Sequence, residues 1–120
     1  MTQSLVVKVT CGQEDAERCN QGFTVAATAV AAGNPVSLWL TGEAAWFGAP
    51  GRAEAFHLVG ATPLQDLLGT VIASGRVTVC SQCAARRSLT EADLLPGVQI
   101  AGAAVFTEEV LRDNVQALVY

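Results

Sequence analysis

Residues 76–88 read Arg-Val-Thr-Val-Cys-Ser-Gln-Cys-Ala-Ala-Arg-Arg-Ser, and this order predicts a strand that passes through a tight turn into a helix. The β-branched run at 77–79 favours a strand that stops at Cys80, and the alanines and arginines that follow favour a helix. Cys80 would then lie at the carboxyl end of the strand and at the amino end of the helix. Unpaired backbone N–H groups and the positive end of the helix dipole stabilise a thiolate at such a position. Cys80 is therefore the predicted reactive residue.

Outward from this segment, strands and helices alternate along the chain. Apolar runs predict further strands at 5–9, 35–40, 98–101 and 117–120. Apolar residues at three- and four-residue spacing predict helices at about 15–32, 63–74 and 103–113. A capping box at Thr62, with Pro63 at the first helical position, opens the second of them. Shorter features are a helical turn at 44–47, a loop at 48–61 and a capped turn at 90–93.

This alternation predicts an α/β fold, namely a single-domain three-layer sandwich with a mostly parallel five-stranded sheet of flavodoxin-like type. Residues 1–120 are expected to form that one domain. In such sheets sites form at the carboxyl ends of the strands, near the point where the strand order reverses. Cys11, Glu14 and Glu43 follow the first two strands, so we expect them at the same edge of the sheet as Cys80.

The composition excludes several classes of partner. Half of the residues (51%) are apolar and 15% are charged, and the net charge is −4. An acidic chain of this kind is a poor match for nucleic acid or for an anionic membrane surface. Such sparse charge also indicates that part of the surface is buried against another copy of the chain.

The sequence also indicates a compartment. No stretch reaches the roughly 20 apolar residues that span a bilayer, and the first residues lack the basic and apolar regions of a secretory leader. We therefore expect a cytoplasmic protein. In that compartment the four cysteines are expected to be reduced rather than paired in structural disulfides.

With these motifs placed, the chain resembles the DsrE/TusD-like family of sulfur-relay proteins (the DsrE/DsrF-like proteins). The resemblance is carried by the loop at 12–15 ahead of an alanine-rich helix, by Val79-Cys80 followed by Arg86-Arg87, and by the closing strand–helix–strand at 98–120. It implies a compact α/β domain that assembles into trimers or hexamers. It also implies a sulfurtransferase-like role, in which a cysteine carries persulfide sulfur between a donor protein and an acceptor protein.

The family's sulfur-carrying cysteine falls on Cys80. Cys83 makes a Cys-x-x-Cys variant, which only part of the family has. At Ser88 many relatives have glycine, so the end of the short helix is expected to differ.

Each candidate residue also has a plain structural interpretation. Cys80 would otherwise be a small buried apolar residue. Cys83 either resolves a persulfide on Cys80 by forming a disulfide or serves in packing. Arg86 and Arg87 either supply positive charge or form a solvated helix end, since six residues of helix span about 9 Å.

The remaining candidates likewise have both a functional and a structural interpretation. Glu14 and Glu43 are either part of the site or surface charges, and the lone His57 lies in a loop where a solvated side chain is the default. A four-thiolate zinc site is not expected, because Cys11 and Cys19 lack the close spacing of zinc ligands. No metal or other cofactor is expected, and flavin binding is disfavoured because the first strand is not followed by a phosphate-binding loop.

Three rival functions remain beside sulfur transfer. A dithiol oxidoreductase would use Cys80 together with Cys83. A phosphatase or arsenate reductase would use the Cys-x5-Arg spacing from Cys80 to Arg86, although the intervening residues lack the glycine that an oxyanion loop usually needs. In a non-catalytic oligomeric binding module Cys80 would be merely structural.

Overall fold

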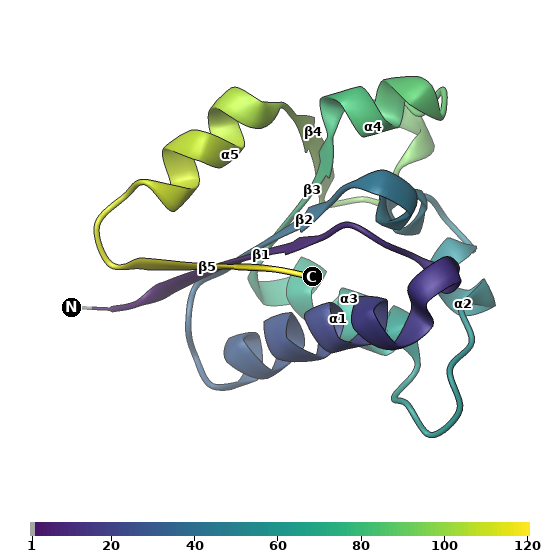
Figure 1. Ribbon diagram of the computed structural model, residues 1–120, viewed down its shortest axis with the longest axis horizontal. Helices are drawn as coiled ribbons and strands as arrows, with labels where there is room; N and C mark the ends of the chain where they lie inside the picture. The colour runs from purple at the N-terminus through teal and green to yellow at the C-terminus, as the bar shows by residue number, and fades with distance from the viewer. Residues whose placement is uncertain (1) are drawn as a thin grey trace.

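A computed structural model describes residues 2–120 and shows a five-stranded sheet whose strands all run parallel (Figure 1). The strands are β1 (Ser4–Val9), β2 (Val36–Leu40), β3 (Arg76–Cys80), β4 (Val98–Ala101) and β5 (Val115–Val119). Their order across the sheet is β4-β3-β2-β1-β5, so the order reverses at β1. The predicted α/β fold is confirmed, and the sheet is parallel throughout.

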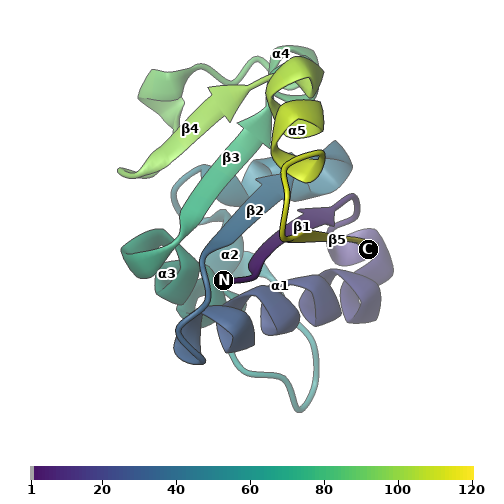
Figure 2. The same cartoon turned by 90° about the vertical axis from the view of Figure 1, so that its left-hand side faces the viewer.

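Helices cover both faces of this sheet. They are α1 (Ala16–Ala31), α2 (Arg52–Ala55), α3 (Leu64–Ser74), α4 (Ser81–Arg86) and α5 (Ala103–Val110), with 3-10 turns η1 (Gln13–Asp15), η2 (Gly42–Gly48) and η3 (Glu91–Asp93). In Figure 1, α1 and α3 lie side by side beneath the sheet and α5 lies above it. Figure 2 shows the same separation after a turn of 90°. The three predicted layers are therefore present.

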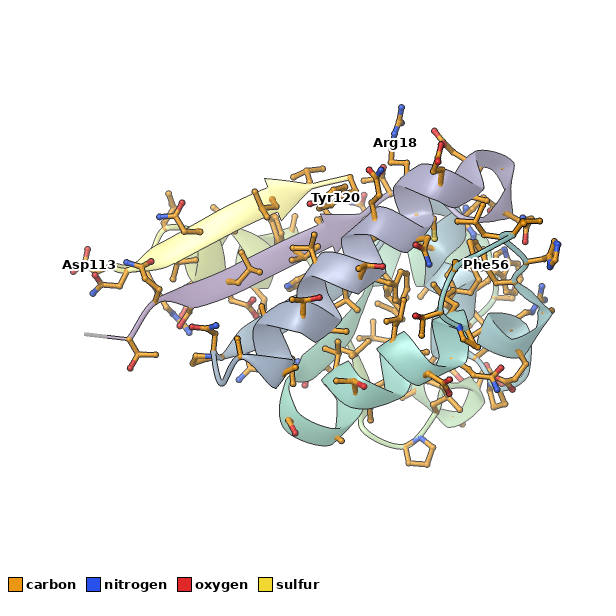
Figure 3. The ribbon with its side chains drawn as sticks, turned by 90° about the horizontal axis from the view of Figure 1, so that it is seen from below. Arg18, Phe56, Asp113 and Tyr120 are labelled. Atoms are coloured by element: carbon orange, nitrogen blue, oxygen red, sulfur yellow. The ribbon has the colours of Figure 1, made fainter. Side chains whose placement is uncertain are left out.

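The main core lies between the sheet and the layer formed by α1 and α3. Alternate strand residues point into it, as the two-residue period of a strand requires. Its fully buried members include Val7, Val9, Leu38, Leu40, Val77 and Val79 from the strands, and Phe23, Leu68 and Val71 from the helices. Gly22 lets α1 approach β1 closely, because a Cβ atom there would lie 2.6 Å from Val9 Cγ2. Figure 3 views the molecule from this side, with Tyr120 at the end of β5 lying beside α1.

Two predictions between residues 48 and 65 are wrong. The predicted loop contains α2, where the Arg52 guanidinium lies 4.1 Å from the centre of the Trp46 ring of η2 and Ala53 is buried. A four-residue helix is too short to show a periodic pattern. The predicted capping box at Thr62 does not form, because Pro63 is itself the N-cap of α3 and no side chain caps that end.

The last part of the chain is shifted relative to the prediction. α5 ends at Val110 and β5 begins at Val115, both earlier than expected. Asn114 has a φ of 60°, a left-handed conformation that asparagine adopts more readily than most residues, and it turns the chain directly into β5. The predicted turn at 90–93 is confirmed, with Thr90 and Asp93 capping each other's backbone.

Candidate functional site

Cys80 is the last residue of β3 and the N-cap of α4. The strand passes directly into the helix, with no turn residues between Cys80 and helical Ser81. Across the sheet Cys80 is paired with Ala101, the last residue of β4, and Gly102 then caps the start of α5. A Cβ atom on Gly102 would lie 3.0 Å from Ser81 Oγ, so the two helix starts are in contact. Cys80 is partly exposed where they meet.

These surroundings lower the pKa of the Cys80 thiol. Partial burial raises that pKa, but several groups together outweigh it: the backbone N–H groups of Cys83 and Gln82, a hydrogen bond with the Cys83 thiol, and the positive charge of Lys8. The two N–H groups belong to the first turn of α4 and have no partners within the helix. A lower pKa increases the thiolate fraction at neutral pH, and the thiolate is the nucleophilic form.

Cys83 is buried one turn along α4. The backbone N–H of Gly42 donates a hydrogen bond to Cys83 Sγ over 3.2 Å, and this bond joins α4 to the start of η2, just after β2. Cys83 therefore contacts Cys80 on one side and is held by the neighbouring strand end on the other. The structure brings the two predicted cysteines together.

The two arginines have different surroundings. Arg87 forms an ion pair with Glu43, with its Nη2 and Nε atoms 2.7 and 3.1 Å from Glu43 Oε2. Its Nη1 atom donates to the Cys83 carbonyl over 3.1 Å, so Arg87 closes the carboxyl end of α4. Arg86 is exposed. Because Ser81–Arg86 is an α-helix, the Cys-x5-Arg spacing does not form an oxyanion loop.

The end of α4 has Ser88 at a position that glycine usually occupies in helix ends of this kind. Ser88 has a φ of 55°, in the left-handed region that favours glycine. The N–H groups of Ser88 and Leu89 bond to the carbonyls of Ala85 and Ala84, at 3.2 and 2.9 Å. This is the Schellman arrangement that usually ends with glycine at the left-handed residue. The helix therefore ends in the usual way, with the strain of a side chain added.

Cys11 follows β1 at the same carboxyl edge of the sheet where Cys80 ends β3, as expected, but no hydrogen bond of the described residues joins it to Cys80 or Cys83. It is buried beside Cys19, and its thiol contacts the Asp15 carbonyl over 3.7 Å. Burial, reinforced by the charges of Asp15 and Glu14, raises the pKa of the Cys11 thiol. Burial likewise raises the pKa of Cys19 to about 12, so at both positions burial disfavours the thiolate, which is the nucleophilic form.

The loop before α1 does reach the edge of the site. Glu14 Oε1 accepts a 2.7 Å hydrogen bond from the Gly12 N–H, and Gly12 packs against Glu43, where a Cβ atom would lie 3.3 Å from the Glu43 Cβ. Glu14 therefore shapes its own loop, whereas Glu43 links that loop to Arg87. Of the two acidic candidates, Glu43 is the one bound to the segment that carries Cys80.

On the α5 side of the sheet lies a polar cluster that the sequence analysis did not identify. Glu109 of α5 is buried, and its Oε1 atom accepts hydrogen bonds from Ser37 Oγ at 2.7 Å and from Trp39 Nε1 at 3.1 Å. Its Oε2 atom lies 3.4 Å from Arg76 Nη1. Lys8 lies on the same face, with its ammonium 4.4 Å from the centre of the Phe106 ring. In the sequence, Lys8 is the one charged residue within the first apolar run, and this interruption is the only local sign of the polar cluster.

Two cavities lie away from Cys80. One of about 370 Å³ opens at the amino ends of the strands and is bounded by Arg76, Glu109 and Arg112 among others. The second, of about 210 Å³, is bounded by Gln13, Trp46 and other residues near η2. Cys80 lines neither.

His57 has no contact with Cys80 among the interactions of the described residues. Its side chain is exposed, and its backbone N–H and C=O both bond to the Gln13 side-chain amide at 2.8 Å. Within residues 2–120, no group of three or more His, Cys, Asp or Glu side chains is arranged to hold a metal ion. Over the same residues, no helix is long and apolar enough to cross a bilayer.

Comparisons with known proteins agree with this architecture. A model of the DsrE/DsrF-like family matches residues 3–115. The YchN protein from E. coli superimposes with a TM-score of 0.80 at 18% sequence identity, over 100% of both chains. MTH1491 from Methanobacterium thermoautotrophicum, a protein of unknown function, superimposes with a TM-score of 0.69 at 10% identity, over 98% of this chain and 99% of its own. At these identities the two structures show a shared fold, and no curated protein sequence matched the chain.

Proposed function

The chain belongs to the DsrE/DsrF-like family, and from this membership and the setting of Cys80 we propose that it is an intracellular sulfur carrier. Cys80 would hold persulfide sulfur between a donor protein and an acceptor protein. The observation that carries the proposal is the partly exposed thiol at the start of α4, where backbone N–H groups lower its pKa. No metal or other cofactor is required for this chemistry.

The transfer consists of two balanced displacements. The Cys80 thiolate attacks the outer sulfur of a donor persulfide, the donor's S–S bond breaks, and the donor cysteine leaves as a thiolate with the bonding electrons. The outer sulfur is then bonded to Cys80 as a persulfide. An acceptor thiolate attacks that outer sulfur in the same way, and Cys80 returns to its thiolate. A low pKa favours Cys80 as the leaving group in the second step.

The partial exposure of Cys80, which lines neither of the two cavities described above, supports a protein partner. We also propose a homo-oligomer, a trimer or hexamer as in the family. β5 is an edge strand whose apolar side chains are exposed, with Leu118 and Val119 at 40% and 63%, and Leu111 just before it is 77% exposed. Unpaired edges of this kind are normally covered.

A dithiol oxidoreductase is the second candidate, because Cys83 contacts Cys80 and is held in place by Gly42. In that reaction the Cys80 thiolate would attack a substrate disulfide, form a mixed disulfide and release one substrate thiolate. The Cys83 thiolate would then attack the Cys80 sulfur and release the second substrate thiolate. The substrate is reduced by two electrons and the protein is left with a Cys80–Cys83 disulfide.

Intact-mass measurement separates the two candidates. The reduced protein is incubated with a cysteine desulfurase and L-cysteine, and Cys80→Ser and Cys11→Ser variants are treated in parallel. A carrier gains the mass of one sulfur atom in the wild type and in Cys11→Ser, and gains nothing in Cys80→Ser. A loss of two hydrogens without added sulfur supports the oxidoreductase, and an unchanged mass supports the binding module.

A further inference from the structure

We propose that Lys8 supports sulfur transfer through Cys80: its ammonium, held beneath α5 by the Phe106 ring, stabilises the negatively charged forms of Cys80. Those forms are the attacking thiolate and the persulfide anion that stores the sulfur. The inference rests on the proposed function for the persulfide stage, whereas the effect on the thiolate can be tested without any sulfur donor.

The strand register places Lys8 on the same face of the sheet as Cys80. Lys8 is paired with Trp39, and Trp39 is paired with Thr78. Directly paired residues of parallel strands point to the same face, and Cys80 follows Thr78 by two residues, so its side chain points there too. Both side chains therefore lie on the side of the sheet that α5 covers.

The aromatic rings and Glu109 fix the ammonium on that face. Phe106 packs edge-on against Trp39, with ring centres 5.3 Å apart, and the Lys8 ammonium lies 4.4 Å from the Phe106 ring centre. One turn further along α5, Glu109 bonds to Trp39 Nε1 at 3.1 Å and holds the helix on the sheet. A cation over an aromatic face is attracted by the ring quadrupole and is less free to turn into solvent.

Other charged groups near this face are already engaged elsewhere. Glu109 is bonded to Ser37, Trp39 and Arg76 at the amino end of the strands. Glu43, from η2, is paired with Arg87 of α4. Lys8 is the charged group whose field contributes to the lowered pKa of Cys80, next to the N–H groups of α4 and the thiol of Cys83. It is also the only lysine of the chain.

The test is the pH profile of alkylation of Cys80 by iodoacetamide, a neutral reagent, followed by mass spectrometry. Lys8→Met should react about fivefold more slowly at pH 7, which corresponds to the loss of one partly solvated charge, and its profile should move to higher pH. Lys8→Arg should restore the wild-type profile. Arg112→Met removes an exposed cation just beyond the carboxyl end of α5 and is the matched control, with no change expected.

A Lys8→Met profile that superimposes on the wild type would overturn the proposal, and so would a Lys8→Arg profile as slow as that of Lys8→Met. If Lys8→Met does not fold, Phe106→Leu keeps an apolar contact but removes the ring, and it should slow alkylation in the same direction. Added salt should narrow the gap between wild type and Lys8→Met. Failure of sulfur loading with an intact Lys8 effect would refute the carrier function and with it the persulfide part of this inference, and it would leave the effect of Lys8 on the Cys80 thiolate standing.

Discussion

Glu109 offers the sharpest test of how the α5 layer is held, because its side chain is 5% exposed and accepts hydrogen bonds from two residues of β2. Glu109→Ala would leave the buried Trp39 N–H and the Ser37 hydroxyl without an acceptor. Arg76 is 55% exposed and can return to water, so little is lost there. Removal of one partner from such a buried network should lower the free energy of unfolding by about 3 kcal/mol. For a chain of this length that is a fall in melting temperature of roughly 10 °C.

The neighbouring residue provides a matched control. Glu108 is 73% exposed and pairs with Arg112, which lies just beyond the end of α5, so Glu108→Ala should cost about 0.5 kcal/mol or less. Glu109→Gln keeps an oxygen acceptor for Trp39 and Ser37 and should cost about 1 kcal/mol. Urea denaturation followed by circular dichroism measures all three variants. Equal losses for Glu108→Ala and Glu109→Ala would refute the reasoning.

Further changes in stability are expected at Ser88, at Arg87 and at the buried thiols of Cys11 and Cys19. Ser88→Gly relieves the left-handed strain at the end of α4 and should raise the free energy of unfolding by about 0.5–1 kcal/mol in urea denaturation; no gain would mean that the serine is not strained. Arg87→Ala removes an ion pair and a helix-end hydrogen bond and should cost about 1–2 kcal/mol, whereas the exposed Arg86→Ala should cost less than about 0.5; equal losses would contradict this. Burial raises the pKa of the Cys11 thiol, and it raises the pKa of the Cys19 thiol from 9.0 to about 12. Both thiols therefore stay protonated in the folded chain at a pH where the same thiols ionise in the unfolded chain. Stability should therefore be complete below pH 9 and fall as the pH rises towards 12, as measured by thermal melts, and a flat profile across that window would contradict the assignment.

The fold and the position of Cys80 could be predicted because they depend on local patterns. Apolar runs, helical spacing and the change from β-branched to helix-forming residues at Cys80 act within a few residues of one another. The same holds for the turn capped by Thr90 and Asp93. The strand that ends at Cys80 and the first turn of α4 are adjacent in the sequence. Together they are enough to place the Cys80 thiol beside backbone N–H groups that have no partner within the helix.

The polar cluster under α5 could not be predicted in the same way. Lys8, Trp39 and Glu109 come from three separate elements, and they meet only because the connection from β4 to β5 carries α5 across to the opposite face of the sheet. A glutamate in an amphipathic helix normally faces solvent, so nothing local marks Glu109 as buried. The strand order also governs how Cys11 relates to Cys80: both lie at the carboxyl edge of the sheet, but Cys11 follows β1 and Cys80 ends β3, two strands away.

The central claim is that sulfur is carried on Cys80, and peptide mapping of the loaded protein tests it most directly. After incubation with a desulfurase and L-cysteine, the protein is alkylated and cleaved with trypsin, which releases the peptide of residues 77–86 with both Cys80 and Cys83. Fragmentation of that peptide should place the additional sulfur on Cys80, and addition of a thiol acceptor should remove it. Additional sulfur on Cys11, Cys19 or Cys83 in place of Cys80, or none on any of them, would contradict the account.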